Sequence, residues 1–184
     1  QTALLARKTL GSENILVFDS LTASLGTGIA AIKAARMAAS GLNIQAIFER
    51  LSFIRRTREV LFTLDTLENV VKGGRLNKFT GLAGDVLNIK PILRGNDEGI
   101  PVIVEKVRGR GKAIRRLVDM VGEISSPSIG DRLIGISHVR CPEEAAKLAR
   151  EIEEKYRPKE PIIIAEMGAT IGVYAGVGGL MINC

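Results

Sequence analysis

The chain has 184 residues, of which 46% are hydrophobic and 25% charged, and its formal net charge is +6 at pH 7. That length suffices for one large domain or two small ones, and the apolar share is ordinary for a globular protein. The longest uncharged stretch, Met167 to Cys184, is interrupted by glycines and falls short of the ~20 strongly apolar residues of a membrane helix, so we expect no membrane span.

The first residues, Gln1 to Leu10, have the apolar and basic character of a helix end rather than of a secretion signal, which leads us to expect that the chain begins inside a domain. Two cysteines, Cys141 and Cys184, are too few for a disulfide framework and match no metal spacing. A reducing compartment suits such cysteines, so we expect a cytoplasmic protein with no bound metal or cofactor.

The N-terminal part predicts a strand, a loop and a helix in that order. Ile15 to Phe18 is a short apolar run typical of a buried parallel strand, and Ile29 to Ala39 predicts a helix that ends at Gly41. Asn43 can cap the next helix. Its buried face is predicted from apolar residues at helical spacing, namely Ile44, Ile47, Phe48 and Leu51. We interpret residues 1–60 as part of a doubly wound parallel α/β unit.

From residue 61 onward, strands and helices alternate rapidly. Apolar runs predict strands at Leu61–Leu64, Ile89–Leu93, Pro101–Val107, Leu133–Ile136 and Ile162–Ala165. Helices are predicted after Thr66 as far as Gly73-Gly74, through Leu82 and Val86, along the stripe Ile114, Leu117, Val118 and Val121, and over Glu143–Tyr156. Residues 95–99 read as a hairpin loop, which requires an antiparallel pair. Residues 61–184 are therefore predicted to form a second α/β domain with a mixed sheet.

Motifs for catalysis are weak. The run Gly109-Arg110-Gly111-Lys112 is followed by Ala113, where a phosphate-binding P-loop needs Ser or Thr, and its glycines lack the P-loop spacing. His138 is the only histidine and has no recognisable nucleophile to serve. We therefore expect no enzyme activity, and keep a phosphate-handling enzyme or transferase subunit as the alternative because of the glycine-rich loops and Arg75.

The basic charge raises nucleic acid as a third hypothesis, since clustered Lys and Arg neutralise phosphates. The chain has no Trp, five Phe and two Tyr, and these aromatics do not alternate regularly with the basic runs. Such a pattern does not make a base-stacking platform. We expect no nucleic acid partner.

Four stretches together resemble one known family. These are Val17–Gly28, with its Asp-Ser followed by a loop serine and glycines, Thr66–Leu76, which closes in Gly-Gly-Arg, Leu87–Leu93 followed by Val107–Ala113, and the glycine-rich Ile171–Leu180. Their order and rough spacing are similar to those of the DegV family of bacterial fatty-acid-binding proteins. The likeness covers nearly the whole chain, which would correspond to the C-terminal two-thirds of a member, with the N-terminal segment absent.

The resemblance implies a function. Members of this family bind one long-chain fatty acid without catalysis, with the acyl tail buried in the second domain and the carboxylate at the domain junction. In bacteria that have a fatty-acid kinase, they present the carboxylate for phosphorylation. The resemblance thus implies a long-chain fatty acid as ligand and a fatty-acid kinase as partner.

Three residues are candidates for the carboxylate site. Ser24 lies in a glycine-flanked loop leading into a helix N-terminus, which suits an anion, although it could equally be a helix cap. Arg75 follows the Gly-Gly turn and could reach a carboxylate or remain a surface arginine. Tyr174 stands where the family has histidine, and Val177 where it has the proline of Gly-Pro-Gly. A tyrosine can donate a hydrogen bond but does not titrate at physiological pH, which puts presentation to a kinase in doubt.

Candidates for the acyl tail are apolar residues of the predicted elements, each of which could also be ordinary core: Ile29, Leu82, Val86, Ile92 and Leu180. Arg108 and Arg110 belong to a basic stretch that members of the family could use to meet the kinase. Lys112, Arg115 and Arg116 extend this stretch along a helix, opposite the apolar stripe. An acidic protein partner and a merely solvated surface are the two interpretations of this stretch.

Overall fold

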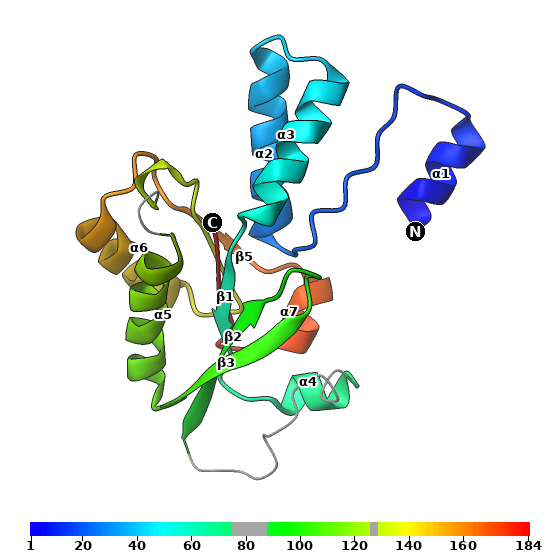
Figure 1. The fold of residues 1–184 in the computed structure, drawn as a ribbon. Coiled ribbons are helices and arrows are strands. Elements are labelled where there is room, and N and C mark those ends of the chain that lie inside the picture. The colour runs from blue at the N-terminus through cyan, green and yellow to red at the C-terminus, as the bar shows by residue number, and fades with distance from the viewer. Residues whose placement is uncertain (75–87, 126–128) are drawn as a thin grey trace.

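The protein, described by a computed structural model over residues 1–74, 88–125 and 129–184, is built on a mixed six-stranded sheet. The strands lie in the order β3-β2-β1-β6-β4-β5 (Figure 1). Their bounds are β1 Val60–Thr63, β2 Ile89–Gly95, β3 Pro101–Arg108, β4 Gly135–His138, β5 Ile163–Glu166 and β6 Leu180–Asn183. Neighbours pair antiparallel except β4 and β5, which are parallel. The predicted α/β fold with a mixed sheet is confirmed.

The predicted hairpin is formed by β2 and β3. Its turn, residues 96–100, is closed by Asn96, whose N–H donates to the carbonyl of Ile100 at 2.9 Å and whose side-chain oxygen accepts from the N–H groups of Glu98 and Ile100. A bulge between Ile92 and Leu93 interrupts the register. The extra residue is Val104 of β3, so β2 keeps its alternation, and its adjacent residues Ile92 and Leu93 lie in separate core clusters on the two faces of the sheet.

The strand predicted at Ile15–Phe18 is wrong, whereas the assignment of residues 1–60 to a doubly wound unit stays a prediction. Among the described residues before β1 there are only helices, α1 (Thr2–Leu10), α2 (Leu25–Ala39) and α3 (Ile44–Arg56). The 15–18 run is extended but unpaired, and its apolar character reflects packing on a helix, because the rings of Phe18 and Phe48 meet edge to face with centroids 5.9 Å apart.

The N-terminal helices take different positions around the sheet. Figure 1 shows α1 at the far end of an extended segment, away from the sheet. In contrast, α2 and α3 pair with each other, and α2 contacts β4 where Leu25 and Ile29 lie against Gly135. Asn43 caps α3 as predicted, since its side-chain oxygen accepts the N–H of Ala46 at 2.9 Å.

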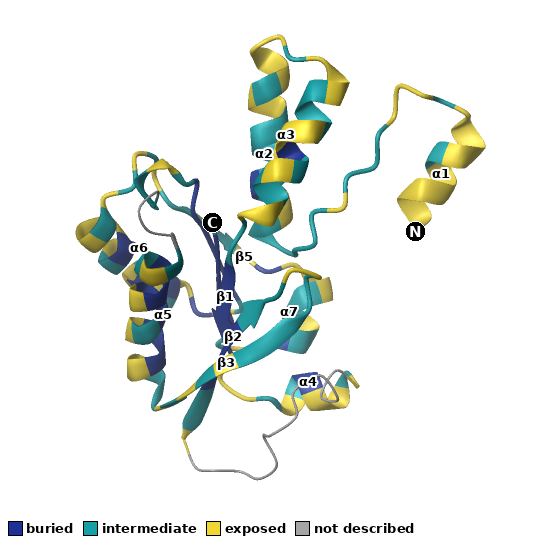
Figure 2. Ribbon diagram, in the orientation of Figure 1, coloured by how far each residue is buried: buried dark blue, intermediate teal, exposed yellow. Residues whose placement is uncertain are grey.

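One face of the sheet is covered by α5 (Arg110–Ser125) and α6 (Pro142–Tyr156), with a short 3-10 helix at Ile129–Asp131 after α5. The predicted apolar stripe of α5 is buried in full and packs with α6 and the sheet (Figure 2). The larger of the two core clusters lies on this face, and it includes Ile92, Leu148 and Ile182, all at most 1% exposed. It is a close-packed hydrophobic core.

The opposite face is covered more loosely. Here α4 (Glu68–Lys72) and α7 (Ala169–Ala175) lie against each other and against a second, smaller apolar cluster of β1, β2 and β6. Thr66 accepts the N–H of Glu68 at 3.1 Å, and Gly73 ends α4, so the predicted turn is confirmed. The space that α4 and α7 leave over the sheet holds the candidate site.

Candidate functional site

A cavity of about 410 Å³ lies between the sheet and helices α4 and α7. The strand period of two puts alternate residues of β1 on one face, and so Val60, Phe62 and then Leu64 form its floor, while Leu61 joins the opposite core. Val70 of α4 and Ile171 of α7 line its sides. A largely apolar cavity of this size is of the kind that encloses a small organic ligand.

Two loops line one end of the cavity, which we call its mouth. One is the mouth loop, residues 19–24, of which Leu21, Thr22 and Ala23 line the cavity. The other is the hairpin turn, residues 96–100, which contributes Glu98 and Gly99. The floor is apolar, while backbone groups and a few polar side chains gather at this entrance. Such an arrangement suits a ligand with an apolar body and a polar end.

The mouth loop carries strained backbone. Leu21 and Ser24 have φ angles of 50° and 52°, a region that side chains other than glycine rarely adopt. Ser24 directly precedes α2, yet within the described chain its hydroxyl makes no capping hydrogen bond to the helix. Strained residues of this kind concentrate at functional sites. The hydroxyl therefore stands at a helix N-terminus, beside the cavity-lining Ala23, without acting as the cap.

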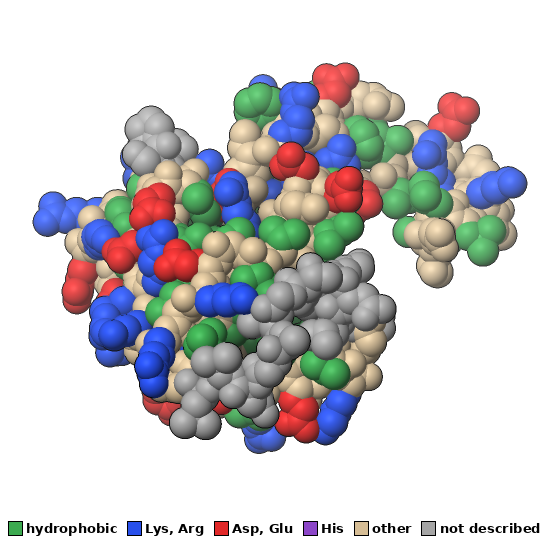
Figure 3. Space-filling view, turned by 60° about the horizontal axis from the view of Figure 1, so that its bottom comes forward, with side chains coloured by type: hydrophobic (Ala, Val, Ile, Leu, Met, Phe, Trp, Pro, Cys, Tyr) green, Lys and Arg blue, Asp and Glu red, His purple; other side chains and the backbone are tan. Residues whose placement is uncertain are grey.

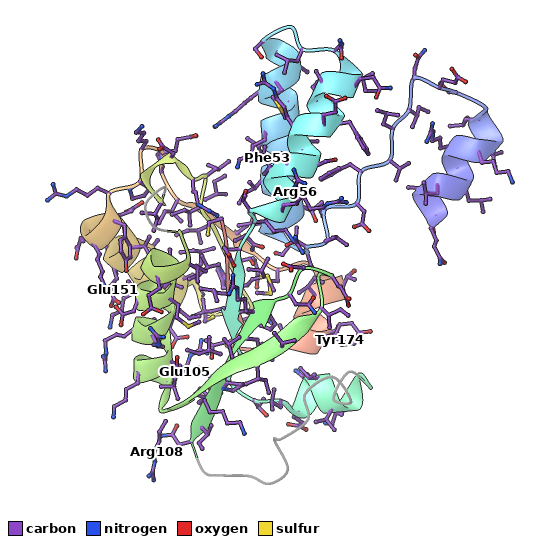
Figure 4. All side chains as sticks on the ribbon, in the orientation of Figure 1. Phe53, Arg56, Glu105, Arg108, Glu151 and Tyr174 are labelled. Carbon is purple, nitrogen blue, oxygen red and sulfur yellow. The ribbon has the colours of Figure 1, made fainter. Side chains whose placement is uncertain are left out.

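Tyr174 enters the site from α7 (Figure 4). It is partly buried and lines the same cavity as residues 21–23 of the mouth loop. Its ring packs against Gly73 at the end of α4. Of the three predicted carboxylate residues, Tyr174 lines the cavity, Ser24 does not line it although its neighbour Ala23 does, and Arg75 lies outside the described residues.

Comparison with known proteins identifies the fold family. The family model described as "Uncharacterised protein, DegV family" matches residues 1–183. The chain belongs to the DegV family. A DegV domain-containing protein of Listeria innocua is 32% identical over 180 residues, which are 98% of this chain and 62% of that protein. This DegV-family chain therefore spans less than two thirds of the length of the curated relatives it matches.

Solved DegV structures share the whole fold of the chain. A crystal structure of a family member from Ruminococcus gnavus, refined with vaccenic acid, superposes with a TM-score of 0.89 at 28% identity, covering 99% of this chain and 64% of that one. A fatty acid binding member from Streptococcus agalactiae gives a TM-score of 0.84 at 26% identity, covering 100% of this chain and 64% of that one. Two structural neighbours of this DegV chain are thus described with a fatty acid or as fatty acid binding.

The residues predicted for the acyl tail are distributed over the molecule. Leu180 of β6 lines the cavity. Ile29 is a buried residue of α2 and lines a separate space of about 40 Å³. Ile92 is fully buried in the core on the α5 and α6 face and is not among the residues that line the large cavity. Leu82 and Val86 lie outside the described residues.

The two predicted partner-binding arginines differ in their surroundings. Arg108 is exposed at the end of β3 and points away from the sheet (Figure 4). Arg110 is turned inward, because its guanidinium pairs with Glu144 at 2.7 Å and also donates to the carbonyl of Gly178. Arg110 is the first residue of α5, and through these two contacts it links the start of α5 to α6 and to the turn before β6.

Several lining residues were missed by the sequence reasoning. Phe62 and Met181 face the cavity from neighbouring strands, and Ile171 faces it from α7. The alternation within residues 60–64 was a usable signal, because every second residue of a strand shares a face. No signal marked Ile171, since its helix was expected only as a glycine-rich stretch.

The described lining of the cavity is mainly apolar. Within the described ranges, no group of three or more His, Cys, Asp or Glu residues is placed to hold a metal ion. His138 is buried in β4 and is not among the residues that line the cavity. The cavity is thus largely apolar, with polar groups at its mouth.

None of the helices in the described part of the chain is long and apolar enough to cross a membrane.

Proposed function

We propose that this protein binds a long-chain fatty acid without catalysis, with the acyl tail in the 410 Å³ cavity and the carboxylate at its mouth. The observation that carries the proposal is the contrast between an apolar floor on β1 and β6 and the strained, polar loop at the entrance. Vaccenic acid in the structure of the R. gnavus relative supports it, and so does the description of the S. agalactiae relative as fatty acid binding. In this proposal residues 61–184 hold most of the tail together with Val60 of β1, and the mouth loop of residues 1–60 contributes to the mouth.

The energetics of such a ligand fit this division. Each methylene removed from water contributes about 0.8 kcal/mol, so a tail of about sixteen carbons supplies roughly 11 kcal/mol before the cost of association. A carboxylate withdrawn from water must find donors, or its desolvation offsets that gain. The donors we assign are the hydroxyls of Ser24 and Tyr174 and the backbone N–H groups at the start of α2. Arg75 is a further candidate.

Presentation of the carboxylate to a fatty-acid kinase is the finer part of the proposal. Arg108, Lys112 and Arg115 are exposed on β3 and α5, and Figure 3 shows Lys and Arg side chains, mixed with Asp and Glu, gathered on this side of the molecule. We expect an acidic kinase surface to meet them. Exchange of Arg108 for Glu should slow acyl-phosphate formation by a fatty-acid kinase while fatty-acid affinity is unchanged.

The test of binding is native mass spectrometry of the chain purified from bacteria and then of the delipidated chain mixed with palmitic or oleic acid. We expect a one-to-one complex in both cases. Delipidated chain that stays empty at a tenfold excess of either acid would refute the proposal. Hexadecylamine is the matched control for palmitic acid, because it has a tail of the same length but a cationic head, and it should bind much more weakly.

A further inference from the structure

Arg58, in the connection between α3 and β1, makes an unusual set of contacts. Its Nε donates to the carbonyl of Leu21 at 3.1 Å, and its Nη1 donates to the carbonyl of Arg55 at 2.6 Å. Its Nη2 donates to the carbonyls of Asn96 and Asp97 at 3.0 and 3.4 Å. All four acceptors are backbone oxygens, and they come from three segments that are distant in sequence. The side chain is partly buried among them.

Two of these segments are the walls of the cavity mouth. Leu21 belongs to the mouth loop, and Asn96 and Asp97 belong to the hairpin turn. The two loops touch, because a Cβ built on Gly99 would lie 2.6 Å from the carbonyl oxygen of Leu21. Gly99 has a φ of +76°, so glycine suits this position both sterically and conformationally. Arg58 therefore bridges the same two loops that meet at the entrance.

The bridge also bears on the strained backbone. Leu21 has its N–H bound to the Asp19 carboxylate at 3.0 Å and its carbonyl bound to Arg58, so both backbone polar groups of this left-handed residue are engaged. A strained conformation persists only where its surroundings over-determine it. A planar guanidinium with five donors can serve several carbonyls at once, which a lysine ammonium cannot do in the same geometry.

We propose that Arg58 is a positioning residue that clamps the mouth loop to the hairpin turn and so sets the rate at which a bound acyl chain leaves the cavity. This inference rests on the proposed fatty-acid binding. It assigns Arg58 no contact with the ligand. Loss of the clamp frees two loops to separate at the entrance, whereas the apolar floor that supplies most of the affinity is untouched.

The test measures release of a fluorescent fatty acid by stopped flow. Exchange of Arg58 for Ala is expected to accelerate release on the order of tenfold, the effect of losing one charge-assisted hydrogen bond. Arg58→Lys should restore only part of the slow rate. The matched control is Arg132→Ala, since Arg132 donates to the carbonyl of Thr57 at 2.7 Å, one residue from Arg58, and does not line the cavity. Release from this control should match the wild type.

If Arg58→Ala folds poorly, a second variant separates the same two loops. Gly99→Ala should push the Leu21 backbone away and also accelerate release, and hydrogen exchange in the ligand-free protein should quicken in residues 20–24 and 96–100 for both variants. Unchanged release and exchange would overturn the clamp alone. If the wild type takes up no fatty acid at all, the proposed function and the clamp both fail. If Arg132→Ala accelerated fatty-acid release as much as Arg58→Ala, the role of Arg58 would be a general structural one and the clamp would be refuted.

Discussion

The ring of Tyr174 lies directly against the backbone of Gly73, so closely that a Cβ at position 73 would be 2.5 Å from the ring carbon Cε1. The φ of Gly73 is −74°, which any residue can adopt, so the requirement for glycine is steric and not conformational. The end of α4 therefore acts as a surface that fixes where the ring of α7 stands in the cavity.

Exchange of Gly73 for Ala should displace the Tyr174 ring and weaken fatty-acid binding. If the tyrosine hydroxyl contacts the carboxylate, we expect a roughly tenfold rise in Kd, close to that of Tyr174→Phe, because both changes remove the same hydrogen bond. Gly168→Ala is the control, since a Cβ at the start of α7 meets open space. Fluorescent fatty-acid titrations measure all three. A Tyr174→Phe protein that binds like wild type would show that the hydroxyl does not serve the carboxylate.

The length of acyl chain accepted by the protein should depend on Ile171. This residue lines the cavity from α7, whereas Val173 on the same helix is 66% exposed. Ile171→Trp adds ring volume to the chamber and should reduce affinity for an eighteen-carbon acid more than for a twelve-carbon acid. Competition titrations over a series of chain lengths test this. Val173→Trp should leave the series unchanged, and a uniform loss at all lengths would contradict the placement of the tail.

Ile92 should contribute to stability and not to ligand selection. It is 0% exposed within the core beneath α5 and α6. Truncation of a buried isoleucine to alanine costs about 2–5 kcal/mol, so Ile92→Ala should lower the free energy of unfolding in urea by an amount in that range. Val104→Ala on neighbouring β3, where the side chain is 45% exposed, should cost much less. If Ile92→Ala changed the relative affinities for acids of different chain length, Ile92 would belong to the tail site after all.

Sequence reasoning located β1 to β5 of the sheet, but it left β6 within the glycine-rich end of the chain and placed some strand bounds too early. The predicted strand at residues 133–136 begins two residues before β4, because Leu133 and Ile134 are buried without being part of the strand. A related cause explains the error at Ile15–Phe18, where Ile15 is exposed and Phe18 is half-buried against Phe48 of α3. Apolar runs report burial, and burial by a helix looks the same in sequence as burial in a sheet.

The site was harder to predict than the fold, because it depends on which face a residue occupies. The register shift at Ile92 and Leu93 leaves Val104 of β3 without a partner in β2, and a shift of one residue within β3 moves a side chain to the other face. Local composition does not reveal such a bulge. The candidate carboxylate residues Ser24 and Tyr174 were found through the family resemblance and not through periodicity, whereas Arg58 carries no motif and emerges only from its contacts.

The thiol of Cys141 provides a pH-dependent test of the packing around β6. This residue is buried, and its Sγ donates to the carbonyl of Gly179 at 3.7 Å. Burial raises the pKa of the Cys141 thiol above its ordinary value, because it disfavours the thiolate. In a Cys184→Ser protein, where Cys141 is the remaining cysteine, a thiol reagent at pH 8 should react at least about tenfold more slowly with the folded than with the unfolded chain.

The same shift fixes the sign of the effect on stability. Because the folded thiol has the higher pKa, its contribution is fully present below the unfolded value of about 8.5 and is lost as the pH rises through the folded value. The free energy of unfolding of the wild type should therefore fall more steeply above pH 8.5 than that of Cys141→Ala. Equal slopes, together with rapid modification of the folded protein, would mean that the thiol is accessible and that the turn at Gly178 and Gly179 opens readily.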